Sequence, residues 1–162
     1  MNPDVLASLV SPSPDHTAAL GRRLALSLRP GDTICLEGRL GAGKTLFARA
    51  VIGALTGEAD VPSPTYTLVQ TYAGPECEVW HADLYRLADS VEVVELGLSD
   101  AFETAIALVE WPDRLDPPPP GALWLAFEPG EETDARRIIA RGSASRWSEP
   151  VTRAFDAVAA DV

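Results

Sequence analysis

Gly38-Arg39-Leu40-Gly41-Ala42-Gly43-Lys44-Thr45 is the stretch that decides the fold, because it completes the pattern G-x-x-x-x-G-K-[ST] of a phosphate-binding loop. The backbone N–H groups of Leu40 to Thr45 can wrap a pyrophosphate, and a helix that begins there adds the positive end of its dipole. Lys44 is the only lysine of the 162-residue chain. Because arginine is larger and forked, a chain that otherwise lacks lysine keeps one where a compact ammonium must reach the β- and γ-phosphates.

The residues on either side of this loop have the pattern that a phosphate loop requires. Thr33 to Glu37 is a short run of strand-forming residues that ends directly before the loop. Apolar residues between Leu46 and Leu55 recur at helical spacing, and the helix is expected to end near Gly57. The sequence therefore predicts a strand, a glycine-rich loop and a helix in succession, which is a nucleotide-binding unit.

The rest of the chain predicts a mixture of strands and helices. We expect a helix from Asp15 to Leu28, a β-hairpin of Tyr66–Tyr72 and Glu76–Ala82, a central strand at Ala105–Val109, strands at Leu123–Phe127 and Arg137–Ala140, and a last helix capped by Ser148. The prediction is a single α/β P-loop NTPase domain over residues 1–162. Its mixed sheet carries a β-hairpin insertion and has helices on both faces.

Composition excludes several classes of function. The formal net charge is −11, so a face that binds nucleic acid directly is not expected beyond a local basic patch around Arg136, Arg137 and Arg141. We find no apolar run of membrane-spanning length and no secretory signal. Cys35 and Cys77 lie in apolar segments and are interpreted as free thiols of a reducing compartment, so we expect a cytoplasmic protein.

Two acids are candidates for the metal-binding and water-orienting roles beside a phosphate loop. Asp83 ends the run Val79-Trp80-His81-Ala82-Asp83, and Glu110 ends the run Ile106-Ala107-Leu108-Val109-Glu110. Ligands of open α/β sheets gather at the carboxyl ends of strands, where both acids are expected. Each could instead be a solvated strand-end carboxylate, but given the loop at least one must serve.

Three further features are weaker evidence for residues of the nucleotide site. Ser63-Pro64-Thr65-Tyr66 resembles the switch segment of nucleotide hydrolases, which senses the γ-phosphate through Mg²⁺, although an ordinary loop is the simpler interpretation. His81 is more typical of a structural histidine than of a catalytic one. Trp111 could stack near the nucleotide or simply pack.

Taken in order, the motifs resemble those of the TsaE (YjeE) family, the bacterial ATPases of tRNA threonylcarbamoyladenosine biosynthesis. They are Gly-x-Leu-Gly-Ala-Gly-Lys-Thr, Ser-Pro-Thr-Tyr-Thr-Leu-Val, His-x-Asp-Leu-Tyr-Arg-Leu and Val-Glu-Trp-Pro, with a weaker echo at Ala135-Arg136. The resemblance covers residues from about Asp15 to Pro112. Arg39 and Leu46 depart from it, since the family commonly has an acid and a second threonine there; both departures bear on affinity.

The resemblance implies an ATP and Mg²⁺ site. The implied ATP-binding residues are Ser11, Gly38, Leu40, Gly41, Ala42, Gly43, Lys44, Thr45, Leu46 and Asp83. Thr45 and Glu110 would hold Mg²⁺, the catalytic residues would be Lys44, Asp83 and Glu110, and Ser63 and Thr65 would belong to the switch loop. Whether Asp83 or Glu110 orients the attacking water stays open.

The function that follows from the resemblance is that of an ATP-hydrolysing subunit acting on the TsaB–TsaD pair, with tRNA involved only indirectly. We found no obvious arginine finger, which suggests a low intrinsic rate that a partner raises. Two alternatives remain: a small-molecule kinase with the same loop, and a nucleotide-gated binding module without catalysis. The short segment after the loop leaves little room for a kinase lid.

Overall fold

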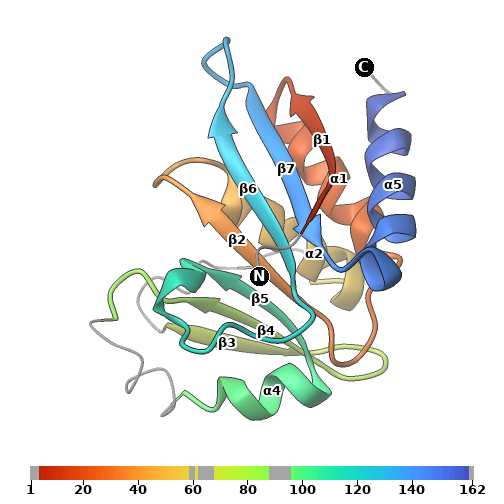
Figure 1. The fold of residues 1–162 in the computed structure, drawn as a ribbon. Helices are drawn as coiled ribbons and strands as arrows, with labels where there is room; N and C mark the ends of the chain where they lie inside the picture. The colour runs from red at the N-terminus through yellow and green to blue at the C-terminus, as the bar shows by residue number, and fades with distance from the viewer. Residues whose placement is uncertain (1–3, 59–60, 62–67, 88–95, 161–162) are drawn as a thin grey trace.

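The computed structural model describes the chain except residues 1–3, 59–60, 62–67, 88–95 and 161–162 (Figure 1). The strands are β1 (Asp4–Ser11), β2 (Thr33–Gly38), β3 (Val69–Ala73), β4 (Glu78–Asp83), β5 (Ile106–Glu110), β6 (Leu123–Pro129) and β7 (Arg136–Gly142). The helices are α1 (Pro14–Ala25), α2 (Lys44–Thr56), α4 (Leu98–Thr104), α5 (Ala144–Ala159) and the short 3₁₀ helix η1 (Pro112–Arg114). None of the helices in these described segments has the length and apolar content needed to cross a bilayer.

Within the described residues the strands form one mixed sheet of seven, in the order β1-β7-β6-β2-β5-β4-β3. Strand β2 lies parallel to both β5 and β6, and β4 lies parallel to β5. The pairs β3–β4, β6–β7 and β1–β7 are antiparallel. The predicted hairpin is therefore present as β3–β4, at the sheet edge opposite β1, although the predicted first strand began at Tyr66 and residues 66–67 lie outside the described residues.

Helices cover both faces of the sheet, as the sequence predicted. Successive side chains of a strand point to opposite faces, and in β5 Leu108 joins a core cluster with residues of α1, α2 and α5, whereas Val109 joins a second cluster with residues of α4. All five residues of β5 are buried, which confirms the predicted central strand. In Figure 1, α4 lies below β3 and β4, away from α1, α2 and α5.

The starts of α1 and α5 differ from the prediction, α1 ends at Ala25 rather than Leu28, and one strand was missed. Ser13, not Asp15, caps α1, because its hydroxyl accepts the backbone N–H of His16 at 3.2 Å. The last helix follows Ser143 and begins at Ala144, so Ser148 lies inside it. Trp147 in its first turns is fully buried and anchors that end of the helix. Strand β1 carries no strong alternation and is held by its pairing with β7.

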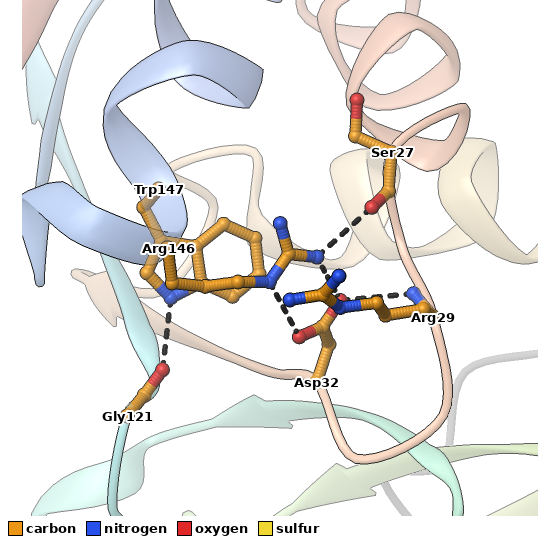
Figure 2. Close-up of polar contacts among 6 residues, drawn as sticks. All are labelled: Ser27, Arg29, Asp32, Gly121, Arg146 and Trp147. Atoms are coloured by element: carbon orange, nitrogen blue, oxygen red, sulfur yellow. Dashed lines mark hydrogen bonds and ion pairs between the residues drawn. The ribbon is translucent and has the colours of Figure 1, made fainter.

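The amino end of β2 is tied to α5 by a closed polar cluster (Figure 2). Arg146 Nε donates to Asp32 Oδ1 at 3.1 Å, Arg146 Nη2 forms an ion pair with Asp32 Oδ2, and Nη2 also donates to Ser27 O at 2.9 Å. The Arg29 backbone N–H donates to Asp32 Oδ2 at 2.9 Å. Beside this cluster, Trp147 Nε1 donates to Gly121 O at 2.8 Å. These contacts join α5, the α1–β2 connection and the residues that lead into β6.

Candidate functional site

The glycine-rich loop connects the carboxyl end of β2 to the first turn of α2, as predicted. Gly38 ends the strand with φ +146°, and a Cβ there would lie 2.7 Å from Phe127 O on the neighbouring strand β6, so only glycine fits. Gly43 precedes α2 with φ +105°, a left-handed conformation that side chains disfavour. Glycine at these two positions therefore allows the backbone conformation of the loop.

This loop forms one side of a cavity of about 550 Å³, a size typical of small-molecule sites. The cavity is lined by Pro14, Thr17, Leu40, Gly41, Ala42, Gly43, Lys44, Thr45, Leu46, Asp83, Tyr85, Arg86, Glu110, Trp111, Asp134 and Arg136. Every predicted nucleotide-binding position from Leu40 to Leu46 is on this wall. Both candidate acids lie on it as well.

The Lys44 ammonium is buried next to the loop. Its Nζ donates to Gly38 O at 2.6 Å and lies 3.6 Å from the centroid of the Trp111 ring. Burial lowers the pKa of Lys44, whereas the carboxylates of Glu110 and Asp83 act in the opposite direction. The described residues give this ammonium no salt bridge, so its partners are a carbonyl and a ring face.

Glu110 joins the three elements that meet at the base of the cavity. Its Oε1 accepts a hydrogen bond from Thr45 Oγ1, in the first turn of α2, at 2.7 Å. Its Oε2 lies 2.7 Å from Nε2 of His81 on β4, and both side chains are almost fully buried. His81 Nδ1 is buried without a partner in the described part of the chain, so the proton belongs on Nε2, which donates to the carboxylate.

Asp83 lies beside Glu110 because the two residues are register partners in the parallel pair β4–β5. Its Oδ1 accepts the backbone N–H of Tyr85 at 3.0 Å. Burial raises the pKa of Asp83; the Tyr85 N–H lowers it, and the neighbouring Glu110 raises it further. The prediction that both acids lie at one edge of the sheet is confirmed.

Two predicted site residues, Ser11 and Gly38, do not line the cavity, and two others fall outside the described part of the chain. Ser11 is fully buried and does not line the cavity; its hydroxyl shares a 2.7 Å hydrogen bond with that of Thr17, which does. Gly38 does not line the cavity, but its carbonyl accepts a hydrogen bond from Lys44 Nζ. Ser63 and Thr65 lie outside the described residues.

The structure also places residues on the cavity that the sequence analysis did not assign to it. Tyr85 and Arg86 come two and three positions after Asp83, so their closeness in sequence to a candidate acid was an available signal. The Tyr85 ring lies 4.8 Å from that of Trp111, centroid to centroid. Arg136 enters from β7; from the sequence it was named only in the Ala135-Arg136 match and as part of a possible basic patch, not as a neighbour of the loop. Arg136, one of the three arginines of the possible basic patch, donates to backbone carbonyls of the loop.

The family comparison and the curated relatives all point to proteins of the same description. Residues 11–138 match the family described as "Threonylcarbamoyl adenosine biosynthesis protein TsaE". The chain is 43% identical over 100 residues to the tRNA threonylcarbamoyladenosine biosynthesis protein TsaE of Rickettsia conorii, which covers 61% of this chain and 57% of that protein. It is 35% identical over 116 residues to the protein of the same name from Aquifex aeolicus, covering 70% and 83%.

A solved structure resembles the whole fold. The crystal structure of Bacillus subtilis YdiB aligns with a TM-score of 0.78 at 26% identity, covering 95% of this chain and 97% of that one. The matched part spans less than two thirds of the two Rickettsia relatives at 43% and 41% identity, 57% and 61% of their lengths.

Proposed function

The chain belongs to the TsaE family, and we propose that it binds and hydrolyses ATP with Mg²⁺ in the cavity beside its glycine-rich loop. The observation that carries the proposal is the hydrogen bond between Thr45 and Glu110, at 2.7 Å on the cavity wall. It places a hydroxyl and a carboxylate together at the first turn of a helix that follows a phosphate loop. This arrangement is typical of the metal site in phosphate-loop hydrolases.

The donor set fits Mg²⁺. The ion prefers oxygen ligands and is commonly held by one or two carboxylates together with the phosphates of the substrate. Within the described segments, no cluster of three or more His, Cys, Asp or Glu side chains could hold a metal ion. The phosphates of the substrate would therefore have to supply further ligands. Thr45 and Glu110 would be the protein ligands, and the bound ion would neutralise charge on the β- and γ-phosphates.

Lys44 and the loop would bind the phosphates. Amides of the loop and the amino end of α2 attract anions, and Lys44 is held by a carbonyl and a ring face that phosphate oxygens can replace. Because the ammonium is already desolvated, its attraction to a phosphate in the cavity is strong. Lys44 would then stabilise the charge that develops on the γ-phosphate during attack by water.

Asp83 is the residue that we assign to orient that water. Both carboxylate oxygens of Glu110 already have partners, Thr45 and His81. Asp83 uses Oδ1 for the Tyr85 N–H, and its Oδ2 has no hydrogen-bond partner among the residues that the structure describes. An acceptor on the cavity wall with an available oxygen is suited to holding a water molecule.

The biological role that we propose is in threonylcarbamoyl modification of tRNA adenosine. Its support is the family and the names of the curated relatives. ATP turnover would act on the TsaB and TsaD proteins, and tRNA would be contacted through them. A net charge of −11 agrees with an indirect relation to RNA.

Phosphate release, measured for the chain alone and with purified TsaB and TsaD, tests the proposal. We expect slow Mg²⁺-dependent release that the partners accelerate, and loss of release in Glu110→Gln. Arg153→Ala, an exposed change on α5 far from the loop, is the control. Absence of ATP binding would overturn the assignment of the site. Transfer of phosphate to a small acceptor would indicate a kinase, and partner function that survives Glu110→Gln would indicate a binding module.

A further inference from the structure

Arg136 connects the phosphate loop to a hairpin that is distant from it in the sequence. From the first position of β7, its Nε donates to Ala42 O and its Nη2 to Gly41 O, each at 3.1 Å. Its Nη1 donates at 2.8 Å to the carbonyls of Thr133 and Ala135, in the connection between β6 and β7. One guanidinium therefore joins two carbonyls of the loop to two carbonyls of the hairpin.

These contacts determine which way the loop peptides face. The C=O of one residue and the N–H of the next belong to one planar peptide and point in opposite directions. Because the Ala42 carbonyl is directed at Arg136, the Gly43 N–H points to the opposite side of that peptide. The Gly41 carbonyl sets the direction of the Ala42 N–H in the same way, and this N–H donates to Arg39 O at 3.1 Å within the loop.

Packing holds Ala42, whose side chain is buried in the core, but it does not hold Gly41. A Cβ built on Gly41 would meet nothing within 4 Å, and its φ is +76°. Glycine loses much conformational entropy when it is ordered, so the Gly41 position, which has no packing contacts, must be held by hydrogen bonds. Charge-assisted hydrogen bonds from a planar fork are the strong kind, and arginine presents two of its N–H groups in one plane to two neighbouring carbonyls.

We propose that Arg136 is a positioning residue for phosphate binding: it holds the Gly41 and Ala42 carbonyls outward so that the loop amides are arranged before the nucleotide arrives. The inference rests on the proposed function. Part of the affinity for the phosphates then depends on a residue about ninety positions beyond the loop. The placement of the β6–β7 hairpin therefore influences nucleotide binding.

The alternative role, a direct charge contact with phosphate, makes a different prediction for lysine. A lysine keeps the charge but cannot form the fork. If Arg136 positions the loop, Arg136→Lys and Arg136→Ala should weaken binding by similar factors. If it contacts phosphate as a charge, Arg136→Lys should bind nearly as well as the wild type.

The experiment compares the wild type, Arg136→Lys, Arg136→Ala and Arg137→Ala. Arg137 is the matched control, since it is the next residue of β7 and is exposed. The dissociation constant of a non-hydrolysable ATP analogue with Mg²⁺ should rise about 10- to 100-fold in both Arg136 variants, the loss expected for one or two charge-assisted hydrogen bonds. Arg137→Ala should bind as the wild type does, and added guanidinium ion should partly restore binding in Arg136→Ala.

A merely structural role would give another pattern. If Arg136 only stabilises the fold, its loss lowers the folded fraction and the apparent kcat, and Kd is unchanged. If Arg136 positions the loop, its loss raises Kd and KM. Hydrogen exchange of the loop amides without nucleotide is an independent readout, and it should be faster in both Arg136 variants. Wild-type affinity with unchanged exchange in Arg136→Ala would overturn the inference. If the wild type bound no nucleotide, the proposed function would fail, and loop exchange alone would decide the role of Arg136.

Discussion

Strand β2 has a buried charged cluster at each end, and the two clusters differ in how their charges are partnered. At the amino end, Asp32 accepts hydrogen bonds from Arg146 and from the Arg29 backbone N–H, so its charge is enclosed by protein donors (Figure 2). At the carboxyl end, Lys44 has a carbonyl and the Trp111 ring face, next to a cavity. A buried charge whose partners are all protein groups cannot lose one without a cost in folding free energy, whereas a charge held by exchangeable partners beside a cavity is available to a ligand.

The largest effect that we expect comes from Lys44→Ala. Nucleotide affinity should fall more than about 100-fold, because a desolvated cation contributes strongly to phosphate binding. The free energy of unfolding should stay the same or rise, since burial lowers the pKa of Lys44 and the cation is therefore costly to bury. Calorimetric titration and urea unfolding check the two parts. A large loss of stability would show that the two clusters are alike.

The converse change is Arg146→Ala at the amino end. Removing one partner of a buried pair leaves Asp32 without its cation, so we expect the free energy of unfolding to fall by about 2–4 kcal/mol. Nucleotide affinity of the folded protein should not change. Arg153→Ala is the matched control on the same helix; its exposed pair with Glu149 should contribute about 0.5 kcal/mol or less. Weakened nucleotide binding in Arg146→Ala would couple the two ends of β2.

Asp83→Asn should give a smaller, pH-dependent effect. Since folding raises the pKa of Asp83, the folded state favours the protonated carboxyl, and that stabilisation is lost as pH rises through the folded-state pKa. At pH 7 the variant should therefore be more stable than the wild type, while its ATP hydrolysis is lost. The difference should shrink as pH falls toward the ordinary aspartate range of about 4. Urea unfolding at both pH values measures it, and a gap that widened at low pH would contradict the assignment.

The smallest effect concerns the middle of β2, between the two clusters. Cys35 and Cys77 are both free, as predicted. Burial holds the pKa of the Cys35 thiol far above its ordinary value, and burial raises that of the less buried Cys77 as well. Iodoacetamide should label Cys77 slowly in the native protein and Cys35 only after unfolding. Native labelling of Cys35 would show that the interior between the two ends opens.

Sequence reasoning succeeded where all the necessary groups are local or where topology leaves little choice. The strand–loop–helix unit from Thr33 to Thr56 is encoded in consecutive residues, and the structure confirms it. Asp83 and Glu110 could be placed together because parallel strands end at one edge of a sheet. The position of β1 was missed because an edge strand depends on its neighbour β7 for its hydrogen bonds.

The resemblance implied that Thr45 and Glu110, 65 positions apart, lie together, and their hydrogen bond agrees with this. Other contacts between distant residues escaped prediction for a related reason: only the sheet register brings His81 to the second oxygen of the Glu110 carboxylate. The start of α5 was placed too late because the burial of Trp147 and its bond to Gly121 outweigh the local capping signal of Ser148.

The sequence by itself determined that this chain has a phosphate-binding loop with one lysine, and which acids could accompany it, because those properties follow from residue type and short-range spacing. The tertiary structure decided that Glu110 is held by Thr45 and His81, and that Arg136 reaches the loop from β7. The physical reason is that hydrogen-bond partners are chosen by distance and direction in space, and those depend on strand order and register.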